Sequence, residues 1–232
     1  MRTHHDNRSR PENMAPLLLT LTLGVALAQP AQAPDLKFSP VPGATLSDQS
    51  WKAEFEYPET ATRAAFDFHD NALRTQGWQR TSLKTDGDDD DQEYDATYRR
   101  DGARVKLDVE SDDDTAEIEL ELTGPLGQTV SLRNPPNLKL GYLGGKSVRD
   151  QSWTLETRYN GTSTAAVYQH YDASLTGQGG QRVSFDKDDR EYDVDYTVSG
   201  QKINLEVERS GDGVKAKLEY EPSDTETDTD SD

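Results

Sequence analysis

Clusters of aspartate are the part of this sequence whose residue types and spacing best fit a chemical role. Acidic runs occupy residues 86–93, 111–117 and 186–193. Carboxylate oxygens are the ligands that hard cations such as calcium prefer, so these runs supply candidate metal ligands. The candidates are Asp86, Asp88, Asp90, Asp112, Asp114, Asp188 and Asp189. Calcium is the one cofactor that the sequence suggests.

The first acidic run only partly matches a known calcium loop. Its three candidate aspartates alternate along the chain, but Gly87 stands at the second position and Thr97 replaces the glutamate that closes an EF-hand. We expect all three runs to lie in loops, where charge is tolerated and keeps a protein soluble. Two alternatives therefore stay open, calcium binding and simple solvation of hairpin tips.

Other catalytic groups are scarce. The absence of cysteine excludes disulfides, thiolate metal sites and a cysteine nucleophile. His69 and His170 have no nucleophile or acid at a catalytic spacing, and we expect each to pack at the edge of a helix. Nucleophile-elbow, zinc-protease and phosphate-loop motifs do not occur in the sequence. No catalytic residue is predicted, and a carboxylate-dependent hydrolase of an envelope polymer is the weaker alternative.

The tetrapeptide DQSW occurs twice, at Asp48–Trp51 and Asp150–Trp153, and marks an internal repeat. An offset of 102 residues aligns 36–84 with 138–186, and roughly two positions in five are identical. An offset of 98 continues the alignment beyond the acidic loop, which is shorter in the second copy. The sequence therefore predicts a tandem duplication.

Each copy is predicted to begin with a strand and a helix. Apolar and charged residues alternate over 51–57 and at the matching positions of the second copy, a period typical of a half-buried strand. Apolar residues then recur at three- and four-residue spacing, which predicts a helix. We expect Thr60 and Thr162 to cap these helices, and Gly77 and Gly179 to end them.

Four further strands are predicted in each copy. A short strand follows each helix, at residues 79–83 and 181–185, and three longer alternating strands come next. Asp101-Gly102 and Ser199-Gly200 mark tight hairpin turns. One apolar and one charged face indicate an antiparallel sheet covered by a helix on one side. The predicted fold class is α+β, with two tandem β-α-β-β-β-β repeats.

Within each DQSW segment, the tryptophan is expected to begin the buried face of the first strand. We expect the aspartate and serine side chains to hydrogen-bond the backbone of the preceding turn. A shared folding requirement would then explain the repetition. The alternative is a ligand contact that was duplicated with the rest of the unit.

The rest of the chain differs in composition from the two copies. Residues 1–33 combine basic residues, an apolar run and small residues at cleavage spacing, and predict a signal peptide. The copies are assigned to residues 34–123 and 135–221, with a Gly- and Pro-containing linker at 124–134. Residues 223–232 lack apolar side chains, and 222–232 is predicted to be a disordered acidic tail. After signal removal, no integral membrane segment is predicted.

The strong negative charge of the chain limits its partners. The formal net charge is −19, so phosphate backbones and anionic lipid surfaces would repel it. We therefore predict no nucleic-acid partner. A basic protein or a cationic or polymeric component of the cell envelope is compatible with this charge. The predicted location is outside the cytoplasm, periplasmic or secreted.

One segment carries a resemblance to known proteins. Residues 68–78, FHDNALRTQGW, resemble the aromatic, Leu, Gly-Trp pattern of small exported bacterial domains, which are largely of unknown function. In those domains a strand and a helix precede an antiparallel meander. The likeness covers most of the first copy, whereas the second copy has Gly180 at the position of Trp78. The element order is also similar to the cystatin-like arrangement, by topology alone.

These observations together predict a non-catalytic binding or scaffold protein of the cell envelope. The resemblance implies an exported domain and transfers no functional residues. Calcium binding through the acidic hairpin loops is the alternative function.

Overall fold

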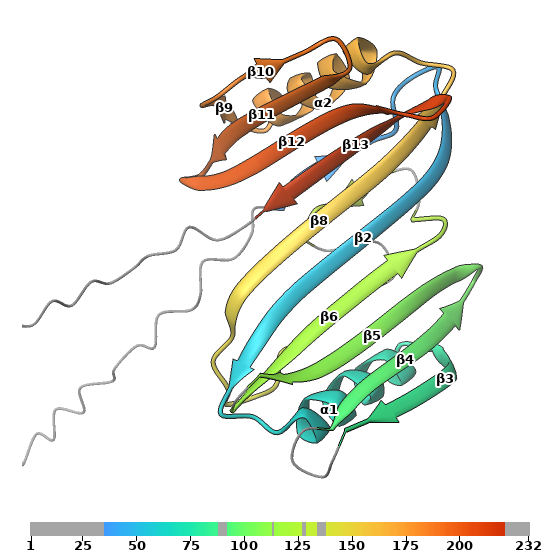
Figure 1. Ribbon diagram of the computed structural model, residues 1–232, viewed down its shortest axis with the longest axis vertical. Coiled ribbons are helices and arrows are strands. Elements are labelled where there is room, and N and C mark those ends of the chain that lie inside the picture. The colour runs from blue at the N-terminus through green and yellow to red at the C-terminus, as the bar shows by residue number, and fades with distance from the viewer. Residues whose placement is uncertain (1–34, 88–91, 113, 127–128, 134–137, 221–232) are drawn as a thin grey trace, which may run out of the picture.

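The computed structural model describes residues 35–87, 92–112, 114–126, 129–133 and 138–220. They form a mostly antiparallel sheet with two helices, α1 (Thr62–Thr75) and α2 (Thr164–Gly177), as Figure 1 shows. This arrangement confirms the predicted α+β character. The predicted signal peptide and acidic tail lie outside the described residues.

Eleven strands belong to one sheet. Those of the first half of the chain are β2 (Thr45–Pro58), β3 (Gln79–Asp86), β4 (Glu93–Arg100), β5 (Ala103–Asp112) and β6 (Thr115–Thr123). Those of the second half are β8 (Arg149–Asn160), β9 (Gln181–Arg182), β10 (Asp186–Lys187), β11 (Glu191–Val198), β12 (Gln201–Ser210) and β13 (Gly213–Tyr220). The order is β10-β11-β12-β13-β8-β2-β6-β5-β4-β3, with β9 beside β11. A separate pair is formed by β1 (Lys37–Phe38) and β7 (Val130–Ser131).

The antiparallel pair β2·β8 joins the two halves, so the sheet is continuous rather than one sheet for each half. Trp51 lies opposite Leu155, and Trp153 lies opposite Ala53, so both indoles project from the same face. All four side chains are buried on that face. The indole N–H of Trp51 also donates to the carbonyl oxygen of Leu132 at 2.7 Å. The first strand of each half is therefore a central strand of one core.

The polar residues of the DQSW segments do not bond the preceding turn, and that prediction was wrong. Asp48 Oδ1 accepts from the backbone N–H of Gln49, the next residue, at 2.9 Å. Ser152 Oγ donates to Glu54 Oε2 on the neighbouring strand at 2.9 Å. The reason is that each DQSW segment lies inside the β2·β8 pair, where its neighbours come from the other half of the chain.

Both helices cover the buried face of the sheet. Helix α1 packs on β4, β5 and β6, and α2 packs on β11, β12 and β13 (Figure 1). Phe66 of α1 stacks on Tyr94 of β4, with ring centroids 4.6 Å apart, and Tyr168 of α2 stacks on Tyr192 of β11 at 4.5 Å. Neither described helix, at 14 residues each, is long and apolar enough to cross a membrane.

The predicted helix caps are shifted by one residue. The cap of α1 is Ala61, and Thr60 Oγ1 instead donates to the carbonyl oxygen of Pro58 at 3.1 Å. The cap of α2 is Ser163, whose Oγ accepts from the N–H of Ala166 at 3.2 Å, in place of Thr162. A serine hydroxyl next to the predicted threonine satisfies the free helical N–H equally well, which sequence alone did not resolve.

The predicted helix ends are confirmed. Gly77 and Gly179 follow the helices with φ of 88° and 91°, a left-handed conformation that glycine adopts without a steric penalty. The short strands after them differ from the prediction. Strand β3 extends to Asp86, whereas the segment after α2 is divided into β9 and β10.

A polar cluster ties each helix to the edge of the sheet, more deeply buried in the first half than in the second. In the first half, Asp70 Oδ1 of α1 accepts from Tyr98 Oη at 2.8 Å and from Arg80 Nη1 at 3.1 Å. Burial, followed by the adjacent Asp70 carboxylate, raises the pKa of the Tyr98 hydroxyl. The matching cluster of the second half consists of Asp172, Tyr196 and Arg182, with both bonds at 2.6 Å.

Replacing Asp70 with asparagine is expected to lower the free energy of unfolding by about 1–3 kcal/mol, because a charge-assisted acceptor beside Tyr98 and Arg80 is lost. Urea unfolding of Asp70→Asn measures this effect. The control is Asp67→Asn, which removes an exposed ion pair with Arg63 and should cost less than about 1 kcal/mol. Equal losses in the two variants would contradict a structural role for the buried cluster.

Candidate functional site on the acidic face of the sheet

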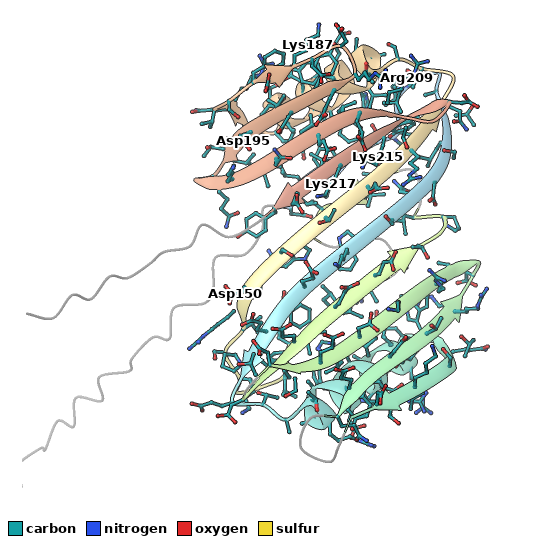
Figure 2. The ribbon with its side chains drawn as sticks, viewed as in Figure 1. Asp150, Lys187, Asp195, Arg209, Lys215 and Lys217 are labelled. Carbon is teal, nitrogen blue, oxygen red and sulfur yellow. The ribbon has the colours of Figure 1, made fainter. Side chains whose placement is uncertain are left out.

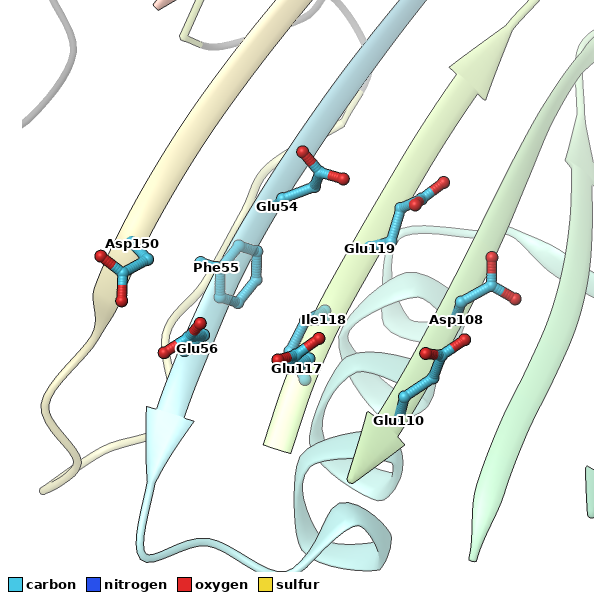
Figure 3. Close-up of a pocket in the computed structure, with 9 residues that line it drawn as sticks. All are labelled: Glu54, Phe55, Glu56, Asp108, Glu110, Glu117, Ile118, Glu119 and Asp150. Carbon is cyan, nitrogen blue, oxygen red and sulfur yellow. The ribbon is translucent and has the colours of Figure 1, made fainter. Parts of the chain in front are cut away.

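The face of the sheet opposite the helices carries charged side chains. Seven carboxylates, six from the first half and one from β8, line a depression of about 280 Å³ on this face (Figure 3). We call this group the acidic face; it consists of Glu54, Glu56, Asp108, Glu110, Glu117, Glu119 and Asp150. They come from β2, β5, β6 and β8, so the site exists only when the strands are paired.

Strand register places these carboxylates directly opposite one another. One row across the strands is Glu54, Glu119, Asp108 and Asp95, and the next is Glu56, Glu117 and Glu110. Like charges directly opposite on neighbouring strands are destabilising. The acidic face therefore gathers negative charges in an arrangement that disfavours pairing of these strands.

Two lysines partly neutralise the first row. Lys52 Nζ lies 2.6 Å from Glu54 and 3.0 Å from Glu119, and Lys106 Nζ lies 2.6 Å from Asp108. Burial works against ionisation of Glu54, but hydrogen bonds from Lys52 and Ser152 outweigh it and lower the pKa of this carboxyl. We call the row of Glu54, Glu119, Asp108 and Asp95 the paired row.

The row of Glu56, Glu117 and Glu110 makes no ion pair with a described lysine or arginine, and we call it the unpaired row. Burial raises the pKa of Glu56, with further increases from Asp150 and Glu117. Burial also raises the pKa of Glu110, together with the negative charges of its neighbours, Glu93 first among them. The folded protein therefore holds Glu56 and Glu110 in surroundings that oppose their ionisation.

The second half carries a different charge pattern on the same face. In the alignment of the two halves, Glu56, Glu117 and Glu119 correspond to Arg158, Lys215 and Lys217. Figure 2 shows both lysines on β13. Lys215 pairs with Glu208, Lys217 lies 2.8 Å from Glu219, and Arg158 lies 3.0 Å from Glu156. A closely similar sheet therefore forms with cations at these three positions.

The candidate aspartates from the sequence lie elsewhere. Asp86 and Asp112 are at the ends of β3 and β5, and Asp114 follows in the next turn. Asp188 Oδ1 accepts from the N–H groups of Arg190 and Glu191, at 2.6 and 2.8 Å. The remaining candidates are Asp88 and Asp90, which lie outside the described residues, and Asp189, which is exposed.

The metal prediction stays a prediction. In the described part of the chain, no three His, Asp or Glu residues are grouped as a metal site. The acidic runs do not lie wholly in loops, and that prediction was wrong. Strand β3 ends at Asp86 and β4 begins at Glu93, while β5 extends to Asp112 and β6 begins at Thr115. In the third run, Asp186–Lys187 forms β10 and β11 begins at Glu191.

The two histidines differ in their surroundings. His69 is fully buried between Phe55 and Phe68, and its Nε2 lies 3.4 Å from Tyr57 Oη. Burial lowers the pKa of His69 to about 4, so the ring is neutral at physiological pH. His170 is partly exposed and contacts the carbonyl oxygen of Ser39 at 2.8 Å. His69 packs inside the core rather than at a helix edge, because its helix face turns toward the sheet.

Sequence reasoning missed the acidic face. Its members alternate with apolar residues along each strand and look individually like ordinary solvent-facing charges. The signal that could have identified them is the change from glutamate to lysine or arginine between aligned positions of the two halves. No protein-family model, curated protein or solved structure matches the chain.

Proposed function

We propose that this chain is a non-catalytic binding protein of the cell envelope whose acidic face binds a cationic partner. The unpaired row carries this proposal. Its three carboxylates are neighbours in register and make no ion pair with a described residue, although Arg149 is the strand partner of Glu56 on β8. The second half has Arg158 and Lys215 at two of the three corresponding positions. The fold accepts cations there, so a functional requirement explains the acidic residues better than a structural one.

The energetics of the unpaired row support a bound cation. The charge of Glu117 raises the pKa of both Glu56 and Glu110, and a basic group placed over the row would oppose that effect. Binding then gains both the new attraction and the relief of existing repulsion. The net charge of −19 adds long-range attraction that speeds encounter with a basic partner.

The proposed location follows from the N-terminal segment. Residues 1–33 have the composition of a secretory signal. The cationic partner is accordingly a basic protein or a positively charged polymer outside the cytoplasm.

We also propose that the two halves are copies of one unit, related by an approximate two-fold axis through the Lys52 and Thr154 pair. Supporting this, the two residues face each other in register and are separated by the 102-residue offset of the alignment. The order of strands and helix is also the same in both halves. On this view, one copy kept an acidic surface while the other became neutralised.

The test is titration of the protein with poly-lysine at increasing sodium chloride, followed by calorimetry. The face variant is Glu117→Lys with Glu119→Lys, which installs the residues of the second half. We expect it to weaken binding at least about tenfold, because like charges are placed against the ligand. Affinity of the unmodified protein should fall as salt rises.

The matched control carries the same change of charge away from the face. Asp189→Lys with Asp212→Lys alters two exposed turn residues of the second half. It should weaken binding much less than the face variant does. Equal losses would mean that net charge alone attracts poly-lysine, and the proposed site would be rejected.

A further inference from the structure

Strand β3 forms an open edge of the sheet. All eight of its residues are exposed, and within the described chain it pairs only with β4. From Ser82 to Asp86 the pairing with β4 is regular. An edge of this kind presents a row of backbone N–H and C=O groups that can pair with another extended chain.

The opposite edge of the sheet is interrupted. Residues 183–185 separate the two-residue strands β9 and β10. The N–H groups of Val183 and Ser184 both point to the carbonyl oxygen of Asp195, at 2.8 and 3.4 Å. Such a bulge disrupts the ladder and blunts an edge. Strand β3 also has a register shift, between Arg80 and Ser82, but from Ser82 to Asp86 it offers a continuous edge.

Negative charge lies beside β3, on the same side of the sheet as the acidic face. A depression of about 490 Å³ spans β3, β4 and β5. Its charged lining consists of Lys84 and the carboxylates Asp86, Glu93, Asp95, Asp108 and Glu110. Register places Asp86 opposite Glu93, so one acidic row continues to the open edge, whereas the row that contains Asp95 ends there at Lys84.

The other side of β3 offers an apolar contact. Leu83 lies opposite the buried Ala96, which places it on the helix-covered side, and it is 41% exposed. A strand added next to β3 would alternate its side chains between these two surfaces. Every second side chain of the added strand would lie beside Leu83, and the remaining side chains would lie on the side of the sheet that carries the carboxylates.

We propose that β3 receives an extended, lysine- or arginine-rich segment of the partner as an added strand. This rests on the proposed function and specifies how the cationic partner is bound. Backbone hydrogen bonds to β3 would give affinity, and alternate basic side chains would reach the carboxylates. A second copy of this chain is a poorer occupant, because its own acidic rows would meet those of the first across the new pair.

Two peptides of equal charge test strand addition. In the first, lysine alternates with valine; in the second, proline replaces every valine, which removes the N–H groups needed for a ladder. We expect the first peptide to bind the full chain at least about tenfold more tightly, through several added backbone hydrogen bonds. Fluorescence anisotropy with labelled peptides measures both affinities.

Amide exchange locates the bound strand. On addition of the lysine-valine peptide, outward N–H groups of residues 79–86 should become protected, while those of β10 should not change. Two variants, Ser82→Pro and Leu83→Pro, provide a second test, since successive N–H groups along a strand point to opposite edges. One variant should keep its melting temperature and lose the preference for the first peptide, and the other should weaken pairing with β4.

The outcomes separate this inference from the function on which it rests. Equal, salt-sensitive binding of both peptides without protection of β3 would overturn strand addition and leave the acidic face as a binding site. Failure of both peptides to bind would overturn both proposals. Protection of β3 without peptide, together with a doubled mass in solution, would show that a second copy occupies the edge and would overturn the inference.

Discussion

Replacing Trp51 with alanine is expected to lower the free energy of unfolding by about 3–5 kcal/mol, because a large, fully buried side chain leaves a cavity. The indole packs at the junction of β2 and β8, and its N–H holds the carbonyl of Leu132. The loss should therefore affect both halves of the sheet. Urea unfolding gives the magnitude.

Amide exchange shows whether the two halves respond together. In Trp51→Ala, core amides of β5 and of β12 should lose protection by the same factor, because both belong to one sheet. The control, Leu83→Ala, changes an exposed side chain and should cost less than about 0.5 kcal/mol. Loss of protection confined to β2–β6 would show that the halves unfold independently.

Replacing Glu117 with lysine is expected to raise stability at neutral pH by about 0.5–1 kcal/mol, while weakening the binding of cations. The expected contact is an ion pair between the new lysine and Glu110. The second half shows it at the corresponding positions, where Lys215 pairs with Glu208. Stability and binding should change in opposite directions, as is common where a functional site carries unfavourable charge.

The dependence on pH follows from the raised pKa values of Glu56 and Glu110. A raised carboxyl pKa in the folded state favours folding below the ordinary pKa, and this contribution is lost as pH rises through the folded value. The unpaired row is therefore costly at neutral pH. The advantage of Glu117→Lys should be greatest there and should shrink as pH falls toward the ordinary carboxyl pKa of 4.5.

Chemical denaturation of both proteins across pH measures this dependence. Lys215→Glu is the reverse change in the second half and should lower stability at neutral pH by a similar amount, because the pair with Glu208 is lost. A stability gain in Glu117→Lys that did not vary with pH would contradict the electrostatic explanation.

Local elements were predictable because their signals are local. Asp101-Gly102 has φ of 51° and 82°, and Ser199-Gly200 has 53° and 82°, the paired positive values of a tight hairpin turn. Glycine ended both helices as expected. The β2·β8 pair could not be predicted, because nothing near Lys52 indicates that its partner is Thr154, 102 residues away.

The acidic face was harder to predict for a related reason. Glu56, Glu117 and Glu110 become neighbours only through strand register. The denser aspartate runs are the more conspicuous sequence feature, although Asp188 accepts from the backbone N–H groups of Arg190 and Glu191. A dense run of one charge is visible locally, whereas a row across strands is a property of the folded sheet.

The junction of β2 and β8 also determines the order in which the chain can fold. Hairpins such as β4–β5 and β12–β13 close over a few residues and can form early, whereas the central pair must wait for its distant strand. During synthesis the first half is complete while β2 still exposes its apolar face and an open edge. That half is then vulnerable to pairing with the wrong chain, so delayed arrival of β8 would promote aggregation during biogenesis.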